Sequence, residues 1–120
     1  MKTHRLVLPG DLNQFGFLFG GQLLKWVDEA SWIAASLDYP DCQFVTVGME
    51  NVNFKISVRE GTILAFESEQ IKVGTTSVTY DVKVRKVREG CKAEGTVMFS
   101  TRVTFVNVDQ EGEKQPLIKR

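Results

Sequence analysis

A carboxylate in the middle of an apolar segment is the first feature of this sequence that could do chemistry. Asp28 lies one helical turn from Leu24 and from Trp32, so the three residues share one face of a predicted helix. A carboxylate in such a setting costs free energy unless it is paired or functional. One interpretation is structural, with Asp28 on an exposed stripe or paired with Lys25. The other is a carboxylate held in a desolvated cleft, where it can act as a base or a nucleophile.

Two features upstream of Asp28 could act on the same substrate. Gly20 and Gly21 stand at the predicted helix start, where the first amides have no internal acceptor and carry the positive end of the helix dipole. Such amides can polarise a carbonyl oxygen, although a glycine pair also suits a tight loop. Asn13 opens that loop. It is either a turn residue or a side-chain amide aimed at a water or a carbonyl.

The elements that must position these residues are one helix and five strands. Apolar residues at helical spacing predict a helix from about Gly21 to Leu37, apolar nearly all round and therefore buried. Alternating patterns predict strands, with a β-bulge near Asn51. Turns are expected at Glu60–Gly61, Lys72–Thr75 and Glu89–Gly90. The predicted strands are Thr3–Leu8, Gln43–Ile56, Thr62–Val73, Val78–Arg85 and a last strand that begins near Val97 and closes near Asp109.

This order predicts an α+β fold in which a curved antiparallel β-sheet wraps around one long buried α-helix. The chain has 120 residues, which is enough for one domain. We expect that single domain to occupy residues 1–112. Residues 113–120 are expected to form a polar, loose C-terminal tail.

Composition excludes several classes of function. Fifteen Lys and Arg balance fifteen Asp and Glu, so there is no basic excess for bulk nucleic-acid binding, and self-association is favoured. No apolar stretch is long enough to span a membrane, and the N-terminus lacks the features of a signal peptide. Cys42 and Cys91 lie far apart, which predicts reduced thiols and a cytoplasmic protein. Because His4 is the only histidine, no metal site is predicted and a Ser-His-Asp triad is disfavoured.

The residues around the candidate site match a known family. From Asp11 to Asp28 the sequence resembles the hotdog-fold acyl-CoA thioesterases of the cytosolic acyl-CoA hydrolase type. That family's pattern is Asn-x-x-Gly, then an apolar residue before Phe-Gly-Gly, then an Asp seven residues after the second Gly. The six matching positions are Asn13, Gly16, Phe19, Gly20, Gly21 and Asp28. Segments further along the chain agree as well, so the resemblance covers nearly its whole length.

The resemblance implies a hotdog fold and hydrolysis of an acyl-CoA to a free carboxylic acid and CoA. It maps the catalytic carboxylate onto Asp28, the loop Asn onto Asn13, and the amide that polarises the thioester carbonyl onto Gly20 or Gly21. Asp28 would serve as general base or as nucleophile, and both roles stay open. No cofactor is implied, because CoA is part of the substrate.

CoA carries phosphates, which need cations near the mouth of the cleft. The candidates for CoA binding are Lys55, Arg59 and Lys72, together with the turn residues Gly74, Thr75 and Thr76.

Spacing along the helix requires a second copy of the chain. Asp28 lies eight residues after Gly20, which is about 12 Å along a helix axis. Both groups must come within about 3 Å of one carbonyl group. We therefore expect a homodimer in which the helix start of one protomer faces the partner's Asp28, and hydrolases of this type are often trimers of such dimers.

Three other functions compete with hydrolysis. Hotdog dehydratases and hydratases use a histidine in or near the helix, whereas His4 lies in the first predicted strand. A non-catalytic acyl-CoA-binding hotdog module would keep the pocket but lose the carboxylate. A purely structural interaction domain would make the pattern of Asn13, the glycines and Asp28 a coincidence.

Overall fold

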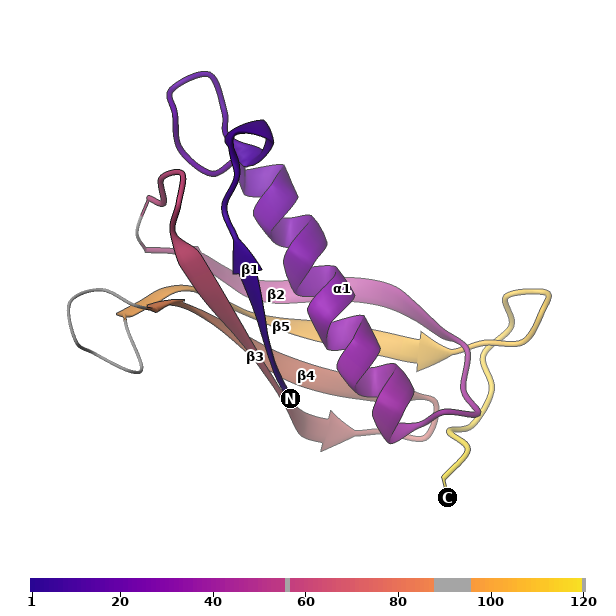
Figure 1. Ribbon diagram of the computed structural model, residues 1–120. Helices are drawn as coiled ribbons and strands as arrows, with labels where there is room; N and C mark the ends of the chain where they lie inside the picture. The colour runs from indigo at the N-terminus through magenta and orange to yellow at the C-terminus, as the bar shows by residue number, and fades with distance from the viewer. Residues whose placement is uncertain (56, 88–95, 120) are drawn as a thin grey trace.

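The computed structural model describes residues 1–55, 57–87 and 96–119, and shows one helix lying across a curved five-stranded sheet (Figure 1). The strand order is β1-β3-β4-β5-β2, and every neighbouring pair is antiparallel. This confirms the predicted α+β class and the curved sheet around one helix. The elements are β1 (Lys2–Leu6), the 3₁₀ turn η1 (Pro9–Asp11), α1 (Gly20–Asp38), β2 (Phe44–Phe54), β3 (Ile63–Val73), β4 (Ser77–Val87) and β5 (Thr96–Asn107).

Helix α1 is one residue longer at each end than the sequence predicts. One face packs on the sheet and buries side chains at helical spacing, including those of Leu23, Val27 and Ala34. The prediction that the helix is buried nearly all round is wrong for a single chain. The Trp32 side chain is 44% exposed and that of Leu37 is 66% exposed, because the sheet covers only one side of α1.

Strand β2 forms an edge of the sheet and carries the predicted bulge. Its register against β5 shifts between Glu50 and Asn53, and the intervening Asn51 has a φ of 56°. Asparagine tolerates this left-handed conformation better than most residues do. A second shift, between Thr46 and Gly48, was not predicted. The bulges let β2 follow the curvature of the sheet.

The C-terminal segment is held against the domain, so the prediction of a loose tail is wrong. The backbone N–H of Gln115 donates to the carbonyl of Asn107 at 2.8 Å, and the N–H of Leu117 donates to the carbonyl of Thr75 at 2.9 Å. The Leu117 side chain packs against the core. These contacts anchor the segment to the end of β5 and to the turn between β3 and β4.

Within the described ranges, no helix has the length and hydropathy needed to cross a membrane. The first strand ends at Leu6 rather than at Leu8, because the 3₁₀ turn begins at Pro9. Ile56, the predicted turn at Glu89–Gly90 and Cys91 lie outside the described residues.

Candidate active site

The half-buried carboxylate of Asp28 lies between α1 and the edge strand β2. The Thr46 hydroxyl donates a 2.6 Å hydrogen bond to Asp28 Oδ1. Asp28 lies on the exposed side of α1 with Lys25 and Trp32, as one structural alternative from the sequence has it. The other alternative is wrong, because no ion pair with Lys25 occurs among the described residues and the partner is a hydroxyl on another element. No described residue bonds to Oδ2. The second carboxylate oxygen is therefore available to a water or a substrate.

The start of α1 presents two backbone amides without an acceptor. The carbonyl of Phe19, the N-cap residue, accepts from the N–H groups of Gln22 and Leu23 at 3.0 and 3.1 Å. In the described part of the chain, the N–H groups of Gly20 and Gly21 have no partner. Since they lie at the positive end of the helix dipole, they can hold a carbonyl oxygen or an oxyanion.

Asn13 shapes the loop that leads to these amides. Its Oδ1 accepts from the backbone N–H groups of Phe15 and Phe17 at 2.9 and 3.1 Å. Gly16, with a φ of 83°, completes the turn. The Asn13 side-chain oxygen thus has the turn role that one interpretation predicted. No hydrogen bond from Nδ2 occurs within the described segments, so this amide group can still donate to a substrate or a water.

A cavity of about 340 Å³ brings several predicted residues together. Asn13 and Gly20 lie at its polar side, and Lys55 lines it as well. Apolar side chains form most of the remaining wall. They are Phe17, Leu18, Leu23, Phe54, Val58 and Met98, and Ser57 completes the lining. The helix start, the Asn13 loop and the segment after β2 therefore form one concave site.

Asp28 is not part of this cavity. It lies eight residues further along α1, a rise of about 12 Å from Gly20, and its partner Thr46 is on the outer edge of the sheet. That edge exposes apolar side chains, among them Val47 at 57% and Phe54 at 52%. One chain thus separates the carboxylate from the helix-start amides, and leaves both beside surface that a second copy could cover.

The six candidate CoA-binding residues fall into two groups. Lys55 lines the cavity, and the guanidinium of Arg59 lies 4.6 Å from the ring centre of Phe17, which also lines it. Lys72 lies at the far end of β3, an 11-residue strand that spans about 36 Å.

Gly74, Thr75 and Thr76 form the turn that follows β3, where the N–H of Gly74 donates to the carbonyl of Ser77 at 2.8 Å. Lys72 and this turn are therefore not at the cavity mouth of their own protomer, contrary to the sequence-based expectation for Lys72.

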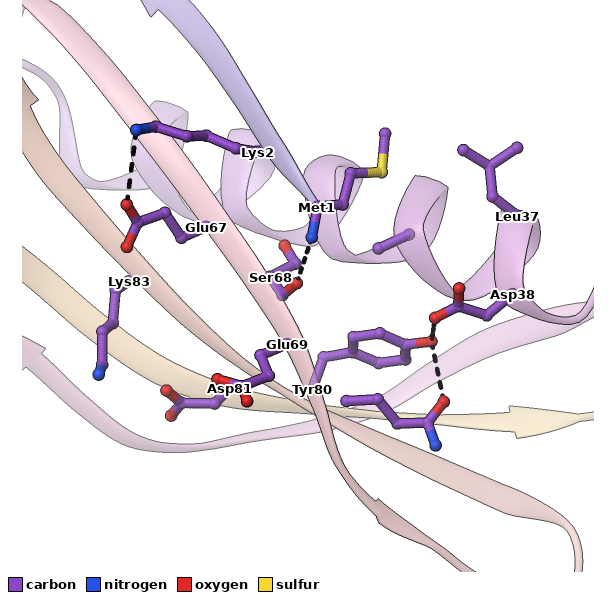
Figure 2. Close-up of a pocket in the computed structure, with 12 residues that line it drawn as sticks. Met1, Lys2, Leu37, Asp38, Glu67, Ser68, Glu69, Tyr80, Asp81 and Lys83 are labelled. Atoms are coloured by element: carbon purple, nitrogen blue, oxygen red, sulfur yellow. Dashed lines mark hydrogen bonds and ion pairs between the residues drawn. The ribbon is translucent and has the colours of Figure 1, made fainter.

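A larger cavity, of about 770 Å³, lies at the other end of α1 and contains none of the predicted site residues (Figure 2). Its main feature is the Tyr80 hydroxyl, which donates to Asp38 Oδ2 at 2.5 Å. Burial raises the pKa of Tyr80 above its ordinary value, and the hydrogen bond to Asp38 raises that pKa further. Among the described residues, no buried polar side-chain atom that lines this cavity is without a hydrogen-bond partner.

Sequence reasoning missed Thr46 and the apolar cavity wall. Thr46 stands between Val45 and Val47 in the predicted strand, a polar position that looks like an ordinary solvent-facing one. The wall draws on four separate segments, and only the tertiary structure brings these together.

Comparisons with known proteins show what this chain is similar to. The family model of the thioesterase superfamily matches residues 15–93. The acyl-CoA thioester hydrolase YciA of Salmonella typhimurium is 30% identical over 114 residues, which cover 93% of this chain and 85% of that protein. The uncharacterized acyl-CoA thioester hydrolase YkhA of Bacillus subtilis is 32% identical, and the match covers 98% of this chain and 66% of YkhA.

Solved structures are similar as well. A hexameric hotdog-fold thioesterase of Campylobacter jejuni superposes with a TM-score of 0.84 at 33% identity, covering 97% of this chain and 88% of that one. The acyl-CoA hydrolase of Staphylococcus aureus, in complex with butyryl coenzyme A and coenzyme A, has a TM-score of 0.88 at 27% identity. The match covers 99% of this chain and 71% of that hydrolase.

The Staphylococcus aureus hydrolase was also solved as single variants in which an Asn, an Asp or a Thr is replaced by Ala. That Asn and Asp are 15 positions apart, as are Asn13 and Asp28. The Thr follows the Asp by 17 positions, and Thr46 follows Asp28 by 18.

Proposed function

The chain belongs to the thioesterase superfamily, as its sequence predicts, and from this premise we propose that it hydrolyses acyl-CoA thioesters to a free carboxylic acid and CoA. The curated relatives that match over most of their length carry the name acyl-CoA thioester hydrolase. The fold of the chain is that of solved hotdog thioesterases. The groups that the reaction needs are all side chains and amides of the protein, so the proposal includes no cofactor.

The observation that carries this proposal is the hydrogen bond between Thr46 and Asp28. It fixes one carboxylate oxygen at 2.6 Å and leaves the other without a partner among the described residues. A carboxylate that is oriented by one hydrogen bond and keeps its other oxygen free can act on a water or a substrate. It therefore favours hydrolysis over an acyl-CoA-binding module.

Each polar group of the site has a separate role in the proposed reaction. The amides of Gly20 and Gly21 donate to the thioester carbonyl oxygen and stabilise the negative charge that develops there. As general base, Asp28 takes a proton from a water that attacks the carbonyl carbon, and the bond from carbon to sulfur then breaks. As nucleophile, Asp28 forms a mixed anhydride with release of the CoA thiolate, and water then hydrolyses the anhydride. In both routes the Asn13 amide donor orients the water or the carbonyl.

Two copies of the chain are needed to assemble one site. The helix start of one protomer and the partner's Asp28 would act on the same thioester, because about 12 Å separates these groups along one α1. The exposed apolar side chains along β2 support this arrangement. The similar thioesterase from Campylobacter jejuni is hexameric, and we propose a homodimer as the minimal unit here.

The same assembly accommodates the CoA candidates. Lys55 and Arg59 lie beside the cavity and are suited to a phosphate near its mouth. Lys72, Gly74, Thr75 and Thr76 would contribute from another copy, whose β3–β4 turn has to reach that mouth. A cytoplasmic location is part of the proposal, and the free thiol of Cys42 is compatible with it.

A thiol-release assay tests the proposal. Wild type, Asp28→Ala, Asp28→Asn and Glu29→Ala would be compared on acyl-CoAs from acetyl to palmitoyl and on aryl-CoAs. Glu29 is the matched control, because it is the neighbouring carboxylate and pairs with Arg5 instead. We expect both Asp28 variants to lose at least about 100-fold in kcat, and Glu29→Ala to stay near wild type.

Either of two results would overturn the proposal. One is a folded wild type that hydrolyses no acyl-CoA, and the other is a folded Asp28→Ala variant as fast as wild type. Acyl-CoA binding without turnover would then identify the chain as a binding module.

A further inference from the structure

The exposed part of the cavity lining carries polar groups beside the Phe54 ring, and its most buried part is apolar. Asn13 and Gly20 are half-buried, and Lys55 and Ser57 are exposed. Leu23, Val58 and Met98 are 1%, 1% and 2% exposed. The hydrogen-bonding groups thus belong to the exposed part of the lining, and its most buried part is hydrocarbon and sulfur only.

This difference in polarity distinguishes the two sides of a bound thioester, which are the acyl chain and the pantetheine arm of CoA. With the carbonyl at the Gly20 amide, one arm must enter the cavity and the other must leave it. The pantetheine arm carries two amide groups and leads to phosphates, and burying those groups against Leu23, Val58 and Met98 would leave them without partners. An acyl chain has no such groups and gains from burial at about 0.8 kcal/mol per methylene.

We infer that this cavity binds the acyl chain, that its size limits the substrate to acyl groups of up to about ten carbons, and that Met98 sets this limit. The inference rests on the proposed function and adds its substrate class. A volume of about 340 Å³ lies at the small end of the range of about 300–1,000 Å³ for ligand sites. At roughly 30 Å³ for a group the size of a water molecule, it holds about eleven such groups. A sixteen-carbon chain would have to extend beyond it.

Met98 is assigned this role because it is a buried part of the lining on a strand that carries none of the catalytic groups. It lies on β5, and its backbone carbonyl accepts from the N–H of Lys55 at 2.9 Å, which holds it against the segment after β2. Leu23 is less suited to this role, since it is one turn from Gly20 and a change there would disturb the helix start. The flexible thioether of Met98 also tolerates substitution better than a branched side chain does.

The experiment measures kcat/KM against chain length for wild type and for Met98→Ala, Met98→Phe and Val103→Ala. We expect wild type to peak between about four and ten carbons and to fall at least tenfold at sixteen. Met98→Ala removes three side-chain atoms and should move the peak up by about two carbons. Met98→Phe should move it down. Val103→Ala is the control, because Val103 is buried on the same strand but does not line the cavity.

If the two Met98 variants shift the preferred acyl-chain length in opposite directions, a general loss of folding cannot be the cause. The inference is overturned if wild type prefers palmitoyl-CoA, or if both Met98 variants change every chain length by the same factor.

A failure of the proposed function is distinguishable, because S-alkyl-CoA thioethers bind without being cleaved. If no acyl-CoA is hydrolysed, thioether affinities that depend on chain length and shift with Met98 still support the acyl cavity. Affinities that do not depend on chain length overturn it.

Discussion

The Thr46 hydroxyl donates to Asp28 Oδ1 at 2.6 Å and so joins the outer strand β2 to the middle of α1. Hydrogen bonds from hydroxyl groups to ionised carboxylates are short and strong, and this one lies in their usual range of about 2.5–2.7 Å. The two residues are 18 positions apart in sequence. The bond ties the carboxylate to β2 and leaves its other oxygen without a partner among the described residues.

Removal of the Thr46 hydroxyl should therefore slow catalysis without removing a reacting group. We expect Thr46→Val to lower kcat by about 10- to 100-fold with little change in KM, because the carboxylate loses its orientation. Thr46→Ser keeps the hydroxyl and should restore most of the rate. Thr104→Val is a matched control, since its hydroxyl pairs with Thr79 on the sheet instead. Equal rates for the Val and Ser variants would show that orientation by Thr46 is unimportant.

Mixing two inactive variants should regenerate active sites. Asp28→Ala and Asn13→Ala are each expected to be nearly inactive as homodimers. In a hybrid dimer, one site combines the intact Asn13 of one protomer with the intact Asp28 of the other. Refolding or co-expression at equal amounts should then recover about a quarter of wild-type activity. Absence of recovery, despite hybrid dimers detected by mass spectrometry, would place both residues of a site in one protomer.

The two glycines at the helix start should respond differently to alanine. A Cβ at Gly21 would lie 2.8 Å from the Phe19 ring, whereas one at Gly20 would lie 3.8 Å from the Phe54 ring. Gly21→Ala should lower the free energy of unfolding by about 0.5–1.5 kcal/mol, because the exposed Phe19 ring has to turn from its rotamer. Gly20→Ala should leave this free energy nearly unchanged or slightly raised.

Urea unfolding measures both effects. Adding Phe19→Ala to Gly21→Ala should relieve the contact. If the double variant is no more stable than expected from the two single variants, the Phe19 ring is not the cause.

Stability should fall at high pH because of Tyr80. Burial and the Asp38 hydrogen bond raise the pKa of Tyr80 in the folded state above the unfolded value of about 10. Above pH 10 the unfolded chain loses this proton while the folded chain keeps it. Ionisation of Tyr80 therefore favours unfolding, by at most about 1.4 kcal/mol per pH unit.

Urea unfolding between pH 8 and pH 11 compares wild type with Tyr80→Phe. The variant should lose some stability at pH 8 through the missing hydrogen bond, but should show the shallower decline above pH 10. Parallel curves throughout would show that Tyr80 does not contribute to the decline.

Much of the fold follows from local patterns. The helix from Gly20 to Asp38 and the bulge at Asn51 were predictable from the sequence. Both depend on the order of apolar and polar residues that are close in sequence: helical spacing for the helix, and a change in strand alternation for the bulge. The attachment of residues 113–119 to the domain was not predictable in this way. It depends on hydrogen bonds to Asn107 and Thr75, which are near only in the folded chain.

The sequence by itself determined the chemical groups of the candidate site. Asn13, Gly20, Gly21 and Asp28 lie within 16 consecutive residues, so their spacing along a loop and one helix was enough to indicate the family. The rise of α1 also predicts a second copy, because helix geometry is constant from protein to protein.

Only the tertiary structure decided what surrounds those groups. Thr46 reaches Asp28 because the edge strand β2 passes beside the middle of α1. The cavity closes because Leu23, Val58 and Met98, from a helix, a loop and a strand, converge at one point. Such contacts depend on the curvature and register of the whole sheet, which result from the packing of all the strands together and are not encoded in any one segment.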